Sequence, residues 1–598
     1  MASGRFSGWG SLVGASASLA VAELARQADA HLLLLADDPR HADQLDAELR
    51  FFAGADFPVL HFVEWETLPW DSFSPHQDII SQRLSVLSQL PSMQRGVTVV
   101  SAPALLQRLP PVDYVAARSL SLRTGQQLSH DEFTGSLAAA GYLRVPQVSE
   151  HGEFAVRGSL IDVFPMGSAQ PVRIDFFDDE IESLRYFSAE SQLSGDTMDS
   201  IELLPAREVP LDDEAIRAFR SRYRERFEGQ PSRSRVYRDV SDGIAHGGIE
   251  YYLPLFFEHT AGLVDYLPDN CMVIRPDGLD GLLQRTWAEI EERHELCSLD
   301  PERPVLAPGE TFAAIDAVSA QLGRHRNIHY SAQSLVDAPD VCNLPTRMPP
   351  ALKIEARYED PAGSLIQFLE SFDGRVLFTT DSAGRREQVH ELLSGRGLDL
   401  VRASGWLDFA AGSHRIGVAI APLENGVLLP DARLAIISEQ QLFGDRVRTQ
   451  RRRRRAERDP EAIIRQLDDL EEGSPVVHAE YGVGRYIGLI TLDVGGIEGE
   501  FLHLEYADGD KLYVPVHALE LISRYTGTSP ENAPLHRLGT DQWEKARRRA
   551  ISKIRDAAAE LLDIYARRAA RTGHRFRWLE ADYRAFESGF PFEPTDDQ

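Results

Sequence analysis

The first 118 residues alternate short apolar runs with amphipathic segments, which is typical of a parallel sheet covered by helices on both faces. Such a doubly wound sheet normally carries a glycine-rich phosphate loop after its first strand, but no G-x-x-x-x-G-K-[ST] motif occurs anywhere in the chain. The expected elements are helices at Ser18–Ala28 and Asp43–Phe52 and strands at Leu32–Ala36, Pro58–Phe62 and Val97–Val100. The sequence therefore predicts a nucleotide-binding fold without a nucleotide site.

The length and charge of the chain limit what it can bind. Its 598 residues correspond to about four domains. With 63 basic and 92 acidic residues the net charge is −29, so phosphates are repelled on average and any contact with DNA must be local. Three widely spaced cysteines favour a reducing compartment. No apolar run approaches the ~18 residues of a membrane span, and Glu23 closely follows a broken apolar stretch near the N-terminus. We expect a cytoplasmic protein without a membrane contact.

The pattern changes several times along the chain. Residues 119–211 read as a small insert of short strands, at Phe154–Arg157, Leu160–Phe164, Val172–Phe177 and Ile181–Phe187. Helical segments and segments of mixed pattern return over 212–345, where Ile249–Phe257 is a mainly apolar stretch. Another αβ rhythm over 346–445, of no assigned role, predicts helices at Leu365–Phe372 and Arg385–Leu393 and strands at Arg375–Thr380, Arg415–Ala421 and Leu434–Ser438. The sequence thus predicts a multidomain α/β protein with an inserted α+β domain.

An uninterrupted arginine run, Arg451–Arg455, lies in the segment 446–472. A solvated linker followed by a short helix explains it, and a local contact with nucleic acid or an acidic partner stays open as the alternative.

Residues 473–527 carry an all-β signal. Strand-like stretches are joined by Gly495-Gly496 and by a turn around Asp508-Gly509, which supply the positive φ of tight hairpins. Leu502, Leu504 and Tyr506 share one face and are expected to be buried, whereas Glu500, His503 and Glu505 face solvent. Gly482-x-Gly484 opens no helix, so it is not a dinucleotide fingerprint. The size suggests an SH3-like barrel, and an apolar stripe over Asp541–Arg568 predicts a long helix within 528–580.

Six stretches of the sequence carry recognisable motifs: Trp65–Asp78 (WETLPWDSFSPHQD), His151–Gly158 (HGEFAVRG), Pro171–Glu180 (PVRIDFFDDE), Val477–Tyr486 (VHAEYGVGRY), Lys511–Pro515 (KLYVP) and Ala559–Tyr565 (AELLDIY). Together they resemble the bacterial transcription-repair coupling factor family, and they keep that family's order. The resemblance implies that residues 1–118 and 212–345 form a module similar to UvrB with degenerate nucleotide chemistry. It also implies that the insert at 119–211 recruits UvrA through Arg157, Arg173 and Phe177.

The same resemblance implies that residues 473–527 form a CarD-type module that interacts with RNA polymerase, through its β subunit. Leu492, just before the Gly495-Gly496 hairpin, is the implied contact, and an edge strand with an apolar anchor suits such binding. The alternative for Leu492 is one more core leucine.

The segment 581–598 resembles the start of a helicase-like ATPase. Phe592, Thr595 and Gln598 correspond to its adenine-binding element, although Asp596 replaces the proline that usually follows the threonine. No Walker lysine or magnesium-binding acid follows, so this chain is expected to have no cofactor, no metal site and no ATPase activity of its own. The full-length family uses ATP and Mg²⁺ and holds duplex DNA mainly through the motor.

The resemblance implies a transcription-coupled excision-repair factor that releases stalled RNA polymerase and recruits UvrA. A UvrB-like damage-binding subunit of the excision nuclease is the alternative, and the missing phosphate-loop lysine argues against it. A stand-alone polymerase-binding regulator would not need the ~470 residues before the β-module.

Overall fold

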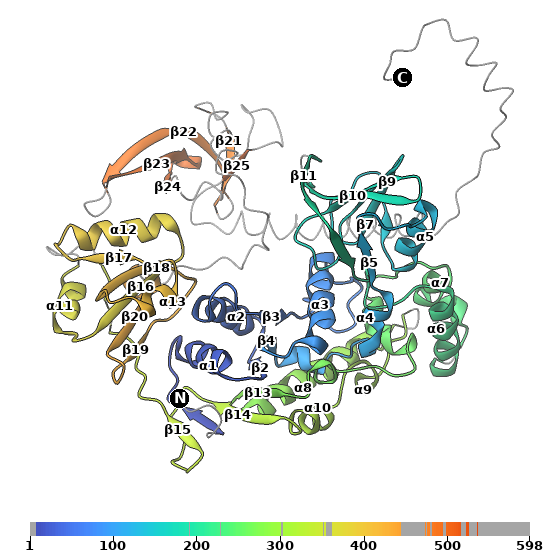
Figure 1. The fold of residues 1–598 in the computed structure, drawn as a ribbon, viewed down its shortest axis with the longest axis horizontal. Coiled ribbons are helices and arrows are strands. Elements are labelled where there is room, and N and C mark those ends of the chain that lie inside the picture. The colour runs from blue at the N-terminus through green and yellow to red at the C-terminus, as the bar shows by residue number, and fades with distance from the viewer. Residues whose placement is uncertain are drawn as a thin grey trace, which may run out of the picture.

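The computed structural model describes the chain almost continuously from residue 7 to residue 443, and only part of the remainder. The described ranges are 7–189, 192–227, 229–300, 303–350, 352–354, 362–443, 473, 475–478, 481–493, 498–515, 522–524 and 535. In Figure 1 a central parallel sheet carries an inserted sheet on one side and a second α/β domain on the other. The arginine run, the helix predicted over 541–568 and the segment Phe590–Gln598 lie outside these ranges.

The central sheet is seven-stranded and parallel, in the order β15-β1-β14-β13-β2-β4-β3. Its strands are β1 (Gly8–Gly10), β2 (His31–Ala36), β3 (Val59–Phe62), β4 (Gly96–Ser101), β13 (Cys271–Pro276), β14 (Arg326–Tyr330) and β15 (Val341–Asn343). Every residue of β2 is buried, because helices cover both faces. The predicted doubly wound sheet is confirmed. The three-residue strand β1 escaped prediction, because so short a run carries no periodicity.

Helices divide between the two faces of this sheet. Leu32 and Leu34 pack with α1 (Ser16–Gln27) and α2 (Pro39–Ala53). Helix α2 includes the predicted helix Asp43–Phe52, and α1 includes the predicted helix Ser18–Ala28 except for its last residue. Leu33 and Leu35 belong to a second cluster on the opposite face. The elements contributing to that cluster include α3 (Gln77–Gln89), α4 (Val112–Arg118), α8 (Leu279–Cys297), α10 (Ile315–Leu322), η2 (Pro103–Leu106) and η5 (Leu263–Tyr266). The chain after residue 270 thus completes the sheet that the first 118 residues begin.

The insert forms a six-stranded sheet in the order β11-β10-β9-β8-β7-β6. Its strands are β6 (Leu143–Arg144), β7 (Glu153–Arg157), β8 (Leu160–Val163), β9 (Val172–Phe177), β10 (Glu180–Phe187) and β11 (Ser194–Met198), with α5 (His130–Ala139) against them. The pair β5 (Leu120–Arg123) and β12 (Ser200–Leu203) joins it to the rest of the chain. All four strands predicted here are confirmed.

Two helices follow the insert, α6 (Asp213–Arg226) and α7 (Arg235–Ser241), with the 3₁₀ turn η3 (Pro231–Arg233) between them. They pack on the 3₁₀ helix η4 (Ile249–Leu255) around Phe219, Tyr223 and Tyr252, and the short helix α9 (Pro308–Thr311) lies nearby. The apolar stretch Ile249–Phe257 is therefore a tightly wound buried turn.

The second α/β domain contains the sheet β17-β18-β16-β20-β19, in which only β19 runs antiparallel. Its elements are β16 (Arg375–Thr380), β17 (Leu400–Arg402), β18 (Ile416–Ile420), β19 (Val427–Leu429), β20 (Leu434–Ser438), α11 (Gly363–Ser371), α12 (Ala383–Ser394), α13 (Trp406–Ala411) and α14 (Glu439–Phe443). Trp406 packs edge-on against Phe52 of α2, with ring centroids 5.6 Å apart. This domain therefore shares an apolar core with the central one.

The β-module is a five-stranded antiparallel sheet in the order β24-β23-β22-β21-β25. Its strands are β21 (Pro475–His478), β22 (Gly482–Asp493), β23 (Glu498–Glu505), β24 (Lys511–Pro515) and β25 (Ile522–Arg524). Leu502, Leu504 and Tyr506 are buried, as the alternation predicted. The ring of Tyr506 lies against Gly484, where an added Cβ would come within 2.9 Å of it. That close approach explains the second glycine of Gly482-x-Gly484.

A buried ion pair joins the insert to the central sheet. Arg83 of α3 and Glu208, at the exit of the insert, have fully buried side chains, and Arg83 Nε donates to Glu208 Oε1 at 2.5 Å. Trp65 Nε1 donates to the other carboxylate oxygen at 3.0 Å. Arg83 Nη1 donates to Gln107 Oε1 and to the carbonyl of Val63. The charges are paired and hydrogen-bonded, which is the condition under which they remain buried.

We predict that Glu208→Ala lowers stability by about 3–5 kcal/mol, because it leaves the Arg83 guanidinium buried without its carboxylate. Urea unfolding followed by circular dichroism measures this. The control is Arg226→Ala, which removes an exposed pair with Glu310 and should change stability by less than about 1 kcal/mol. Equal effects of the two substitutions would contradict the role of the buried pair.

Candidate functional site

One face of the insert sheet collects the residues predicted to bind UvrA. Arg173 and Phe177 alternate with buried residues along β9, so both point away from the core. Arg157 ends β7 and pairs in register with Leu160 of β8, which pairs in turn with Asp175 of β9. Residues separated by up to 20 positions therefore meet on one surface.

Arg173 is held rigidly on this face. Its Nε and Nη2 donate to the two carboxylate oxygens of Asp162 at 2.7 and 3.0 Å, and Nη1 donates to Ser194 Oγ at 3.0 Å. Its guanidinium also lies over the ring of Phe187, 4.9 Å from the centroid. The hydrogen bond to Asp162 raises the pKa of Arg173 further above its usual value. Since Asp162 is buried, loss of Arg173 would perturb folding as well as any interface.

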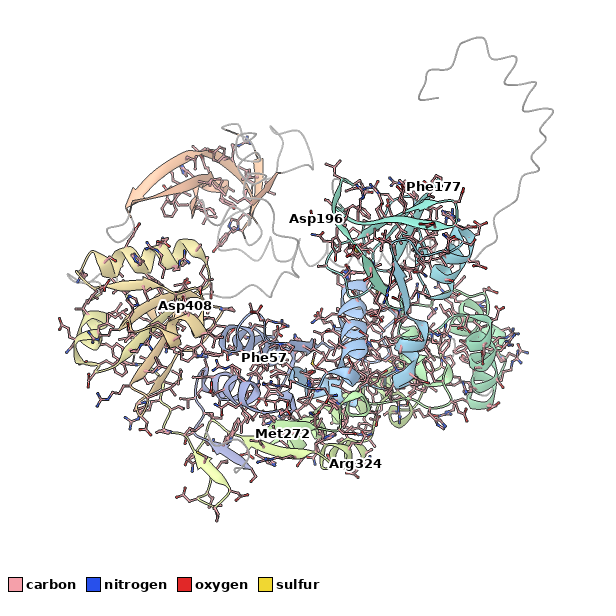
Figure 2. The ribbon with its side chains drawn as sticks, in the orientation of Figure 1. Phe57, Phe177, Asp196, Met272, Arg324 and Asp408 are labelled. Atoms are coloured by element: carbon pink, nitrogen blue, oxygen red, sulfur yellow. The ribbon has the colours of Figure 1, made fainter. Side chains whose placement is uncertain are left out.

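Phe177 and Arg157 have different surroundings. The Phe177 side chain is 70% exposed, and Figure 2 shows it at the outer end of the inserted sheet. Arg157 is exposed and has one long hydrogen bond, from Nη2 to the carbonyl of Pro146 at 3.4 Å. A large exposed aromatic side chain on a face that also presents arginines has the chemistry of an interface hot spot. The sequence did not reveal Asp162, whose role depends on strand pairing.

The β-module presents a strand edge. Strand β22 pairs with β23 from Arg485 to Asp493, but with β21 only from Gly482 to Arg485. Within the described residues, the other edge of β22 beyond Tyr486 forms no ladder. Leu492 lies in this stretch, opposite Gly499 of β23. Leu489 lies there too, and its side chain is 51% exposed, which sequence alternation did not indicate.

The remaining predicted site residues, Phe592, Thr595 and Gln598, lie outside the described residues. Among the residues that the structure describes, no group of three His, Cys, Asp or Glu side chains is placed to hold a metal ion. In the same part of the chain, no helix combines the length and apolar character of a membrane span.

The turn between β1 and α1 occupies the place where a phosphate loop would follow a first strand. Protein groups fill the space beside it. Thr346 Oγ1 accepts from the backbone N–H of Val13 at 3.1 Å and donates to the carbonyl of Ser11. Gly14 has φ +56°, and an added Cβ would lie 2.1 Å from the carbonyl oxygen of Gly426 in the second α/β domain. The turn is a contact between two domains.

Three segments match known domain families. Residues 120–209 match the UvrB interaction domain, residues 368–442 the MFD D3 domain, and residues 470–526 the CarD-like/TRCF RID domain. Three curated proteins named transcription-repair-coupling factor, from Escherichia coli, Haemophilus influenzae and Myxococcus xanthus, are 44%, 41% and 31% identical to this chain. Each alignment covers 98% of this chain and 51% of the relative.

The resemblance to the transcription-repair-coupling factors is confirmed. The chain spans about half the length of the curated relatives it matches, and it aligns with their N-terminal half. The matched domains agree with the mixed α/β multidomain architecture. The insert sheet, the sheet of the second α/β domain and the β-module each fall within one match.

We predict that Gly14→Ala destabilises the contact between the central and second α/β domains. The new methyl group would meet the Gly426 carbonyl, and the positive φ adds about 1–2 kcal/mol of strain. The matched control is Gly278→Ala, which has a similar strain at φ +93° but no atom within 4 Å of the added Cβ. Thermal unfolding should show a clearly lower midpoint for Gly14→Ala; equal midpoints would mean that the turn is not packed against the second domain.

Proposed function

We propose that the whole protein is a transcription-coupled nucleotide excision repair factor. It recognises RNA polymerase stalled at a DNA lesion, releases it by ATP-dependent translocation on DNA and recruits UvrA. The residues described here supply the two protein-binding parts. The observation that carries this proposal is the presence of two separate exposed surfaces, on the insert sheet and on β22, in segments that match the UvrB interaction and CarD-like/TRCF RID domains.

The insert is the UvrA-binding part in this proposal. Phe177 supplies an exposed apolar anchor, Arg157 supplies a charged group with few internal contacts, and Asp162 holds Arg173 in one orientation. An interface forms most strongly around such pre-organised aromatic and arginine side chains, because little conformational freedom is lost on binding. Arg173 is therefore partly a positioning residue for this surface.

The β-module is the part that binds the β subunit of RNA polymerase. The open edge of β22 offers main-chain donors and acceptors to a partner strand, and apolar residues such as Leu489 and Leu492 can select its side chains. We assign an SH3-like barrel to 473–527 and a relay helix to 528–580 as part of the same proposal. The proposal also includes cytoplasmic localisation.

The motor chemistry belongs to the whole protein. ATP and Mg²⁺ would act there, and Phe592, Thr595 and Gln598 would take part in adenine binding. The packed turn at Gly14 argues against a UvrB-like nucleotide site in the central sheet, because a neighbouring domain contacts it there.

We predict that Phe177→Ala combined with Arg157→Ala weakens UvrA binding at least tenfold, since both groups lose their contacts with the partner. Surface plasmon resonance with immobilised UvrA measures the affinity. The matched control is Leu299→Ala with Arg285→Ala, an exposed leucine and an exposed arginine outside the insert, which should bind normally. Wild-type UvrA affinity of the first variant would exclude this surface.

We predict that Leu492→Arg weakens binding to the β subunit of RNA polymerase at least tenfold and leaves UvrA binding unchanged. A charge at an apolar contact must be desolvated when the partner strand docks. Isothermal titration with a fragment of the β subunit measures the loss. The control is Val336→Arg, which adds the same charge to a side chain that is 89% exposed in the central domain. A loss shared by both variants would point to net charge instead of the strand edge.

A further inference from the structure

The helices α6 and α7 concentrate positive charge in an acidic protein. Between Asp213 and Ser241 the sequence has eight arginines and five acidic residues, although the whole chain carries a net charge of −29. Both helices lie at the outer edge of the molecule in Figure 1, next to the neck of the insert. Favourable contact with a polyanion requires such a local excess of positive charge.

One side of α6 carries a row of exposed arginines. Ala215, Phe219 and Tyr223 face the core, whereas Arg217, Arg220 and Arg224 are exposed at spacings of three and four residues. At 1.5 Å per residue this row is about 10 Å long, close to the axial length of three phosphates on one DNA strand. Arg233 and Arg238 are also exposed and follow on η3 and α7. We call these five residues the α6–α7 arginine surface.

The positive charge of this surface lowers the pKa of Tyr237 on α7. Arg220 Nε donates to its hydroxyl at 3.4 Å, and the Arg224 guanidinium lies 5.6 Å from its ring centroid. Burial acts to raise the pKa of Tyr237, but the two guanidiniums outweigh it and hold the pKa below the usual tyrosine value. Two cations converge here on one neutral hydroxyl.

The five arginines have no carboxylate partner among the described residues. Their neighbours on the same helix differ, because Arg226 forms a bidentate pair with Glu310 and Arg222 donates to the carbonyl of Leu255. The charge of the α6–α7 arginine surface is therefore available to an external ligand.

The surface also lacks an apolar anchor. None of the large hydrophobic side chains exposed in the described residues lies between Asp213 and Ser241. A protein interface normally has an apolar or aromatic core, as Phe177 provides on the insert, whereas a phosphate backbone is held by charge alone. We propose that the α6–α7 arginine surface binds the phosphate backbone of duplex DNA, without reading its sequence.

The test is fluorescence anisotropy of the full chain with a 30-base-pair duplex, titrated at several salt concentrations. Arg217→Gln/Arg220→Gln/Arg224→Gln should bind at least tenfold more weakly at 50 mM salt. The slope of log K against log salt should become shallower by about 3, since each lost phosphate contact removes roughly 0.9. The loss should be equal for AT-rich and GC-rich duplexes, and the corresponding triple Arg→Lys variant should retain binding.

The matched control removes three exposed arginines elsewhere, Arg285→Gln/Arg324→Gln/Arg326→Gln, and it should keep the wild-type slope; Arg324 is labelled in Figure 2. Arg217→Gln/Arg233→Gln/Arg238→Gln spares the contacts with Tyr237 and covers the case in which the first variant misfolds.

Equal salt slopes for surface and control variants, or no DNA binding by the wild type, would overturn the proposal. So would unchanged DNA binding with weakened binding of polyglutamate, which would indicate an acidic protein partner. None of these outcomes bears on the UvrA and polymerase variants, which lie on other elements.

Discussion

The buried pair of Arg83 and Glu208 joins the inserted domain to the central sheet, between residues 125 positions apart in the sequence. The insert interrupts the central sheet for about 90 residues. The chain must therefore leave the insert close to where it entered it. At the neck of the insert, inside the core, Glu208 forms an ion pair with Arg83 and accepts a hydrogen bond from Trp65. Because an unpaired charge there would be strongly unfavourable, the pair holds the neck of the insert in one position. A surface carried by the insert is thereby presented in a defined orientation.

The same logic explains the stretch Trp65–Asp78, on which much of the sequence resemblance rests. Its side chains are mainly structural. Trp65 contacts Glu208, Ser74 donates to the buried carboxylate of Glu250, and Asp78 accepts from His151 of the insert. The stretch joins the central sheet, the insert and the η4 segment. We infer that this motif maintains the arrangement of domains, while the docking residues lie elsewhere, on exposed strands.

Two surfaces of this protein differ in chemistry although both contain arginines. On the insert, Arg173 is held by Asp162 beside an exposed phenylalanine, which favours a protein partner. On α6 and α7 the arginines have neither a carboxylate nor an exposed apolar neighbour among the described residues, which favours phosphate. Sequence alone did not separate these two cases, because an arginine in a strand and one on a helix look alike until their partners are known. The helical row was missed altogether, since its spacing is also that of an ordinary solvated helix face.

The sequence by itself determined the type of most elements, because burial on one or both faces imposes a period of two or a continuous apolar run on strands and a period near 3.6 on helices. It predicted β2, β9 and β20 closely, and its motifs indicated the resemblance to the transcription-repair-coupling factors. Only the tertiary structure decided which strands neighbour one another, that β13 and β14 separate β1 from β2, and that Gly426 contacts the turn at Gly14. These outcomes depend on contacts between residues separated by more than 200 positions. Local periodicity cannot encode such contacts, because each contact depends on the shape and charge of a second residue that lies far away in the sequence.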